Sequence, residues 1–248
     1  MWTCSELVLW NSMRRYSRCF AGISRLHRSR TRIGGSHACW IRRAMRSLPA
    51  VPVCGIVPVP QIFSYESSCI VIQETSGAST DDAAGLRPAG KQLAKTLAQR
   101  GVFLDVSHLS AKGFWDLAEC IDTPILATHS NSRKICNHPR NLTDEQFCEM
   151  IRRGGLVGIN FYVPFVTYRR TATCDMVVRH IEHFCELGGA HNLCIGADWD
   201  GCDRFPKGIS DMTGIALLAE ALARRNYSEQ QIAGFLYDNA ARFVQTNF

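Results

Sequence analysis

Hydrophobic and polar positions follow a regular order from about residue 86 to the end of the chain. Amphipathic stretches with helical spacing alternate with short apolar runs of strand length. The expected helices cover 86–100, 110–119, 143–154, 174–187, 213–225 and 228–244. The expected strands cover 103–106, 125–127, 156–161 and 193–197. This alternation predicts an α/β fold in which four parallel strands are joined by right-handed helical crossovers.

Local signals at the ends of several stretches support these boundaries. Thr143-x-x-Gln146 and Ser228-x-x-Gln231 have the pattern of a capping box, which satisfies free backbone groups at a helix start. Gly101 follows the first amphipathic stretch, where glycine commonly ends a helix. These signals are independent of the hydrophobic period, so they strengthen the predicted order of elements.

The first 75 residues differ from the rest in composition and pattern. Residues 1–50 contain ten arginines, no lysine and one acidic residue, Glu6, and they show no sustained hydrophobic period. A disordered segment, or one that is not a natural folded sequence, is the favoured interpretation. An organelle transit peptide and a basic nucleic-acid-binding arm are the alternatives. We therefore divide the chain into a basic, Cys/Arg-rich head at 1–75 and a folded domain at 76–248.

The twelve cysteines show no C-x-x-C pair, which argues against a zinc finger and a disulfide framework. Cys148, Cys185 and Cys194 lie in apolar runs and are expected to be small buried hydrophobes. Reduced thiols favour a cytoplasmic location. No apolar run is long enough to span a membrane. Aromatic and basic residues do not interleave in the expected folded part, so nucleic-acid binding is not expected.

Polar residues follow the expected strands where each strand ends. His108 follows the first strand, His129 the second, Asn160 ends the third, and Asp198 and Asp200 follow the fourth. The carboxyl ends of parallel strands meet at one rim, which is where such folds carry their chemistry. Two neutral imidazoles with a carboxylate suit a zinc site, in which zinc would activate a water, whereas hydrogen-bonded core histidines are the ordinary alternative. Asp198 would then move a proton between that water and a leaving amine.

Other polar residues near the second strand are weaker candidates. Arg140 lies in a loop, where its guanidinium could clamp a substrate carboxylate through two hydrogen bonds. A solvated surface arginine is the ordinary alternative. His138 beside it is expected to be exposed, and His180 and His183 lie in a helix and are expected to be structural or surface groups.

Six motifs in this order resemble the membrane (renal-type) dipeptidases, the M19 metallopeptidases of the amidohydrolase superfamily. The resemblance covers roughly residues 76–248. The matching motifs are Leu86-Arg87-Pro88-Ala89-Gly90, Leu104-Asp105-Val106-Ser107-His108-Leu109-Ser110, Thr128-His129-Ser130-Asn131, Pro139-Arg140-Asn141-Leu142, Gly155-Leu156-Val157-Gly158-Ile159-Asn160-Phe161 and Ile195-Gly196-Ala197-Asp198-Trp199-Asp200-Gly201.

The resemblance implies a TIM-type (β/α)8 barrel with two zinc ions that hydrolyses dipeptides. It implies that His108 and His129 bind one zinc, that Arg140 holds the substrate carboxylate, and that Asp198 is the acid that handles the proton and contacts substrate. The motifs correspond to the C-terminal half of that barrel, with four parallel βα units. At most one zinc site is therefore well supported by this sequence.

The head does not match the pattern that the family implies for the other zinc. The family carries a His-x-Asp pair on its first strand and a bridging glutamate on a middle strand. Residues 1–75 contain only His27 and His37 as histidines, and neither belongs to a His-x-Asp pair; Glu66 and Glu74 are the only acids near the expected bridge. The alternative to an enzyme is thus a catalytically incompetent truncated homologue that binds metal or peptide. A half barrel also leaves sheet edges that a second copy, in a homo-oligomer, could cover.

Overall fold

The computed structural model describes residues 85–247, and within them four short strands form one parallel sheet. The strands are adjacent in chain order, so each helical crossover leads to the neighbouring strand. This confirms the predicted α/β fold with four parallel strands. The expectations for the 1–75 head and for a boundary near residue 76 lie outside the described residues. The strands are β1 (Leu104–Asp105), β2 (Ile125–Ala127), β3 (Leu156–Ile159) and β4 (Leu193–Ile195).

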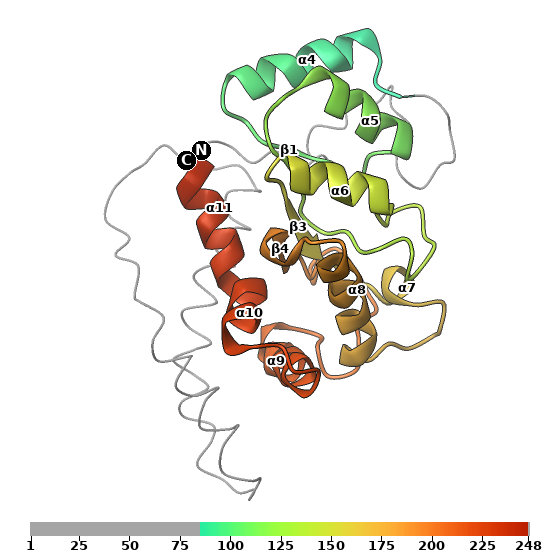
Figure 1. Cartoon of the computed structure of the whole chain (residues 1–248). Coiled ribbons are helices and arrows are strands. Elements are labelled where there is room, and N and C mark those ends of the chain that lie inside the picture. The colour runs from blue at the N-terminus through green and yellow to red at the C-terminus, as the bar shows by residue number, and fades with distance from the viewer. Residues whose placement is uncertain (1–84, 248) are drawn as a thin grey trace, which may run out of the picture. The chain divides into compact units, whose positions relative to one another are not determined.

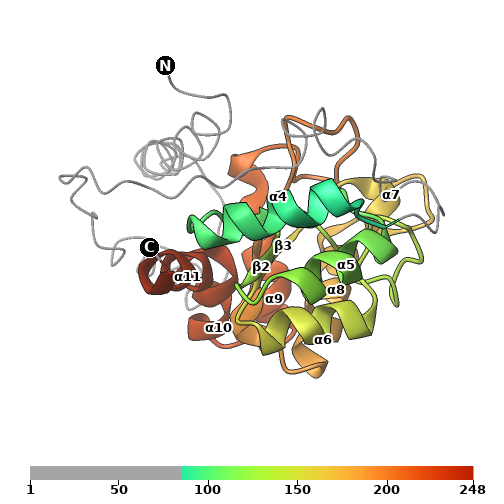
Figure 2. The ribbon, with the colours of Figure 1, turned by 90° about the horizontal axis from the view of Figure 1, so that it is seen from above.

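Helices connect the strands and lie outside them (Figure 1). Helix α4 packs against β1 and α5, α8 packs against β3 and α9, and α11 packs against β3 and β4. Seen from above, α10 and α11 lie to one side, away from α5 and α6 (Figure 2). The helices are α4 (Pro88–Gln99), α5 (Ala111–Cys120), α6 (Asp144–Arg152), α7 (Val163–Val166), α8 (Cys174–Glu186), α9 (Ile215–Arg224), α10 (Glu229–Ala233) and α11 (Asn239–Asn247).

Both predicted capping boxes form. In α6 the Thr143 hydroxyl accepts from the Gln146 N–H at 3.2 Å, and the Thr143 N–H donates to the Gln146 side chain at 2.9 Å. The same reciprocal pair links Ser228 and Gln231 at the start of α10. Gly101 ends the α4 region with a φ of 74°, a left-handed conformation that glycine adopts without steric cost.

The helical core forms on the expected face of α8. Val177, Ile181 and Phe184 are fully buried, and the Phe184 ring stacks on Phe147 of α6 with centroids 3.9 Å apart. Burial of such side chains contributes about 1.5–3 kcal/mol each to folding. This stack joins α6 to α8, and α8 also packs against β3.

Some boundaries differ from the expectation, for local reasons. The stretch expected as one helix at 228–244 is interrupted by a π-helical turn at Gly234–Asp238, where Asn239 donates its side-chain amide to the carbonyls of Ala190 and Leu193 at 2.9 and 2.8 Å. A π-turn leaves no hydrophobic signature, because it shifts the helical register by a single residue. Helix α7 and the 3-10 turns at Ala190–Asn192 and Met212–Gly214 were likewise not expected.

The cysteine expectations are borne out only in part. The seven cysteines within residues 85–247 form no disulfide. Cys148 is exposed, so its assignment as a buried hydrophobe was wrong, whereas Cys185 and Cys194 are partly buried. Cys148 lies between the inward-facing Phe147 and Met150 on α6, and helical geometry turns it outward. No helix of the described residues has the length and apolar character to cross a membrane.

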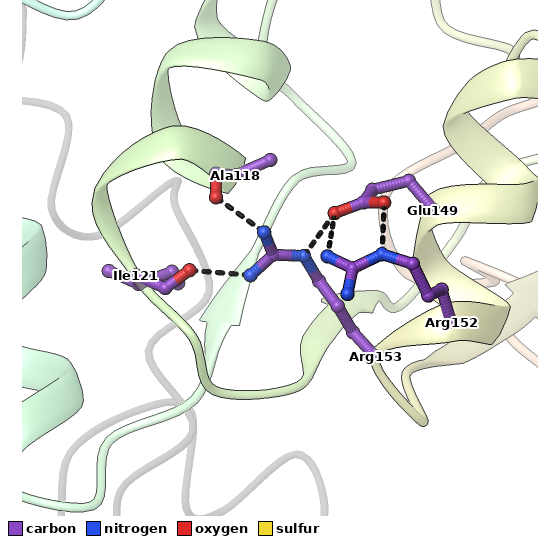
Figure 3. A network of polar contacts seen from close by, with 5 residues as sticks. All are labelled: Ala118, Ile121, Glu149, Arg152 and Arg153. Atoms are coloured by element: carbon purple, nitrogen blue, oxygen red, sulfur yellow. Dashed lines mark hydrogen bonds and ion pairs between the residues drawn. The ribbon is translucent and has the colours of Figure 1, made fainter.

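Arg153, which follows α6, donates hydrogen bonds to backbone carbonyls at the end of α5 (Figure 3). The Arg153 side chain is 7% exposed, and its guanidinium donates to the carbonyls of Ala118 and Ile121 and to the Glu149 carboxylate. Hydrogen bonds from Arg152, and then from Arg153, lower the pKa of Glu149 to about 2. Arg153 thus supplies donors to carbonyls that a helix end leaves without intrahelical partners.

Candidate metal and substrate site

The two strand-end histidines lie against each other. His108 follows β1 and His129 follows β2, and their Nε2 atoms are 2.9 Å apart. The rings meet edge to face with centroids 4.9 Å apart, and both side chains are half-buried. The structure therefore brings together the two residues that the strand pattern singled out.

A buried carboxylate lies beneath His129. Asp105 of β1 is 4% exposed, and its Oδ1 accepts from the backbone N–H of Ser107 at 2.9 Å and of Thr128 at 3.0 Å. The Ser107 hydroxyl donates to the same oxygen at 2.7 Å and accepts from the backbone N–H of His129 at 3.1 Å. The Thr128 hydroxyl contacts both Asp105 Oδ2 and His129 Nδ1, the latter at 2.8 Å. These contacts hold the His129 ring from below.

The histidine pair fits two ligand positions of a zinc ion. Zinc–nitrogen bonds of 2.0–2.1 Å in a tetrahedral site place two ligand nitrogens about 3.3 Å apart. The observed 2.9 Å is close to that spacing. Burial, and then the charge of Arg140, lowers the pKa of His108 to about 4, so the imidazole is neutral at pH 7 and keeps a lone pair for a metal.

The described part of the chain supplies no further ligand beside this pair. Within residues 85–247, no group of three or more His, Cys, Asp or Glu side chains is placed to hold a metal ion. Catalytic zinc sites use three protein ligands and a water. The histidine pair therefore provides part of a coordination sphere.

Arg140 reaches this pair from the loop after β2. Its Nη2 lies 3.1 Å from His108 Nε2, and its Nε donates to the Ser107 carbonyl at 2.7 Å. The guanidinium carbon is 5.2 Å from the centre of the Phe165 ring, within the range of a cation–π contact. His138, expected to be exposed, is half-buried and packs on the same ring at 4.5 Å. Arg140 is therefore held at the rim by defined contacts.

Asp198 follows β4 and has an unusual backbone conformation. Its φ is 61°, a left-handed value that non-glycine residues seldom adopt. The Asn160 side-chain amide donates to Asp198 Oδ2 at 3.3 Å, and the Cys202 thiol donates to the same oxygen at 3.1 Å. Asp198 is one of the charges that raise the pKa of His108, which places it in the electrostatic field of the histidine pair. Asp200 is exposed.

Two other histidines serve the fold. His180 is fully buried, and its Nδ1 accepts from the Ser132 N–H at 3.1 Å while its Nε2 contacts the Val166 carbonyl at 2.9 Å. Burial lowers the pKa of His180 to about 4. His183 contacts Asp144 at 2.8 Å. Both match the expected structural or surface role.

The sequence reasoning missed Asp105 and Cys202 as part of the site. Asp105 had a visible signal, because it is a charged residue within an apolar strand two positions before Ser107. Cys202 had none, since its contact with Asp198 depends on the turn after β4.

The family model described as "Membrane dipeptidase (Peptidase family M19)" matches residues 66–247. An uncharacterized protein of the pqqA 5′ region of Klebsiella pneumoniae is 34% identical over 171 residues, which cover 67% of this chain and 63% of that protein. An uncharacterized dipeptidase of Schizosaccharomyces pombe is 30% identical over 65% of this chain and 40% of its own length. Dipeptidase 3 of Rattus norvegicus is 28% identical over 64% of this chain and 32% of its own length.

Solved structures of metallopeptidases share the fold of this chain. A metallopeptidase from Rhodobacter sphaeroides, liganded with a phosphinate mimic of L-Ala-D-Ala, superposes with a TM-score of 0.64 and 31% identity. The match covers 70% of this chain and 50% of that one. A dipeptidase assigned to family M19 gives a TM-score of 0.63 and 33% identity over 69% of this chain and 51% of that one.

The chain spans about half the length of these solved relatives. Its four parallel βα units correspond to part of their TIM-barrel-like fold. The family model covers well over half of the chain and includes every strand of the sheet and every residue of the candidate site. The chain therefore belongs to the membrane dipeptidase family, peptidase family M19.

Proposed function

We propose that this chain carries out zinc-dependent hydrolysis of dipeptides. The observation that carries the proposal is the convergence of the two imidazoles, with Nε2 atoms 2.9 Å apart and Arg140 beside them. Membership of a dipeptidase family supports the same reaction. His108 and His129 would hold the metal, and a bound zinc would supply a water acidic enough to act as a nucleophile near neutral pH.

Arg140 is the residue we propose for the substrate carboxylate. Its Nε donates to the Ser107 carbonyl, and its Nη2 faces His108, one of the two proposed metal ligands. A guanidinium fixed in this way lies beside the reacting centre and can hold a carboxylate at a set distance from it. Such a clamp selects the C-terminal peptide bond of a substrate, because that bond lies one residue from the free carboxylate, and in a dipeptide it is the only peptide bond. The Rhodobacter relative is liganded with a phosphinate mimic of a dipeptide, L-Ala-D-Ala.

Asp198 is the proposed proton carrier. Asn160 and Cys202 both donate to Oδ2, and within residues 85–247 no donor contacts Oδ1. This arrangement orients the carboxylate and leaves Oδ1 to take a proton from the attacking water and pass it to the leaving amine. The thiol suits this role as a donor, because burial and the Asp198 contact raise the pKa of Cys202 to about 12.

A metal- or peptide-binding homologue without turnover is the second candidate. The observation that favours it is the partial coordination sphere, with two histidines and no third ligand among the described residues. Two ligands bind zinc more weakly than the three protein ligands of a catalytic site.

The full chain, purified with zinc, separates the two candidates. Zinc per chain is measured by elemental analysis, and hydrolysis of L-Ala-D-Ala is followed with Asp198→Asn as the matched variant. An enzyme holds close to the two zinc ions of the family pattern and loses turnover, but not zinc, in Asp198→Asn. Zinc near zero or one per chain, with equal background rates for both proteins, contradicts hydrolysis and supports the binding homologue.

A further inference from the structure

We propose that Asp105 is a positioning residue that acts through Thr128 to hold His129 in the tautomer protonated on Nδ1. In that tautomer Nε2 keeps its lone pair and is ready to bind a cation. The inference deepens the proposed function, since it concerns one of the two proposed zinc ligands. It rests on the direction of each hydrogen bond beneath the ring.

The first step is the role of the Asp105 carboxylate as an acceptor. Its Oδ1 receives two backbone N–H groups, from Ser107 at 2.9 Å and Thr128 at 3.0 Å. The Ser107 hydroxyl accepts from the backbone N–H of His129 and donates its own proton to Oδ1 at 2.7 Å. Every donor to Oδ1 is thus accounted for, and Oδ2 faces the Thr128 hydroxyl.

The second step follows from the single proton of the Thr128 hydroxyl. That oxygen contacts Asp105 Oδ2 and His129 Nδ1, and it can donate to only one of them. A carboxylate has no proton to give, so the hydroxyl donates to Asp105. The same oxygen must then accept from His129, which places the imidazole proton on Nδ1.

The third step concerns the atoms on the other side of the ring. Arg140 Nη2 carries only donor hydrogens, so the contact of 3.1 Å makes His108 Nε2 an acceptor. The nitrogens of His108 and His129 are then two acceptors 2.9 Å apart. His108 Nε2 has a single lone pair, so a metal ion bound to both nitrogens would replace its hydrogen bond from Arg140. The hydrogen bonds that begin at Asp105 therefore leave His129 Nε2 unprotonated, as a metal ligand must be.

The competing explanation is that these hydrogen bonds only stabilise the fold, because Asp105 also links β1 to the loop after β2. Three substitutions separate the roles. Thr128→Ser keeps the hydroxyl, whereas Thr128→Val keeps the shape and removes it. Asp105→Asn replaces an acceptor by an amide that can donate to the Thr128 hydroxyl. The Thr128 hydroxyl would then donate to His129 Nδ1, and the imidazole proton would move to Nε2.

The experiment uses the full chain with 15N-labelled histidine, first without metal. Long-range 1H–15N correlation spectra report which ring nitrogen of His129 is protonated, and His129→Gln identifies its signals. We expect the Nδ1–H form in the wild type and in Thr128→Ser. We expect a shift toward Nε2–H in Asp105→Asn, and loss of the fixed tautomer in Thr128→Val. An Nε2–H form in the wild type, or an unchanged spectrum in folded Thr128→Val, overturns the proposal.

Zinc affinity is then measured by competition with a chromogenic chelator. Loss of a partner that orients a ligand weakens metal binding about 10–100-fold, and we expect that range for Asp105→Asn and Thr128→Val but not for Thr128→Ser. Equal affinity in Thr128→Val and Thr128→Ser contradicts the positioning role. If the tautomers shift as expected and the wild type binds no zinc, the positioning role stands and the proposed function falls.

Discussion

Replacement of Arg153 by alanine tests how much the hydrogen bonds between the end of α6 and the end of α5 contribute to the free energy of unfolding. The Arg153 side chain is 7% exposed and donates to two carbonyls at the end of α5, those of Ala118 and Ile121 (Figure 3). It also shares Glu149 with Arg152, whose side chain is 65% exposed and forms an ion pair with that glutamate. The neighbouring arginine is therefore a natural control.

The expected cost follows from these contacts. A hydrogen bond that involves a charged group contributes about 1.5–3 kcal/mol, and Arg153→Ala removes two such bonds to carbonyls. Water that enters the vacated space replaces part of them, so we expect a loss of about 2–4 kcal/mol in the free energy of unfolding. Arg152→Ala removes an exposed ion pair and should cost about 0.2–1 kcal/mol.

Urea unfolding followed by circular dichroism measures both losses. The midpoint should fall clearly for Arg153→Ala and little for Arg152→Ala, with an unchanged slope for each. Arg153→Lys keeps the charge without the fork of donors and should lie between them. Equal midpoints for the two alanine variants would refute the reasoning, because they would show that the carbonyl contacts add nothing to the shared ion pair.

Four further outcomes are expected. The stability difference between the wild type and Glu149→Gln, measured by thermal unfolding, should be present above about pH 4.5 and shrink as pH falls toward 2, since the folded pKa is about 2. Buried His180, with a pKa of about 4, should make the wild type lose stability as pH falls from about 6.5 toward 4, because only the unfolded chain takes up that proton. His180→Gln should flatten this slope in urea titrations, and parallel curves would contradict it. Arg140→Lys should raise KM for L-Ala-D-Ala more than it lowers kcat, with zinc content unchanged. Gly196→Ala should unfold at clearly lower urea than the wild type, because its Cβ would lie 1.9 Å from the Thr128 carbonyl oxygen.

Much of the fold is predictable from the sequence because its signals are local. The capping residues Thr143 and Ser228 mark helix starts by hydrogen bonds to residues three positions away. The juxtaposition of His108 and His129 was also predictable, because neighbouring parallel strands place their carboxyl ends at one rim.

The support beneath the site was not predictable in the same way. The contact of Asp105 with Thr128 depends on the register of two strands, which pairs Asp105 with Leu126. Register is a property of the sheet and not of either strand alone. The contacts of Arg140 and Cys202 depend on the paths of irregular loops, which no periodic pattern encodes.

The left-handed backbone at Asp198 has an evolutionary consequence. A non-glycine residue at such a φ costs about 1 kcal/mol or more, and glycine removes that cost. Selection for folding alone would thus favour glycine over asparagine and aspartate, which are the non-glycine residues that adopt this conformation most often. An acid kept at position 198 in relatives of this chain, in place of glycine, would therefore indicate selection for the carboxylate, as the proposed role of Asp198 requires.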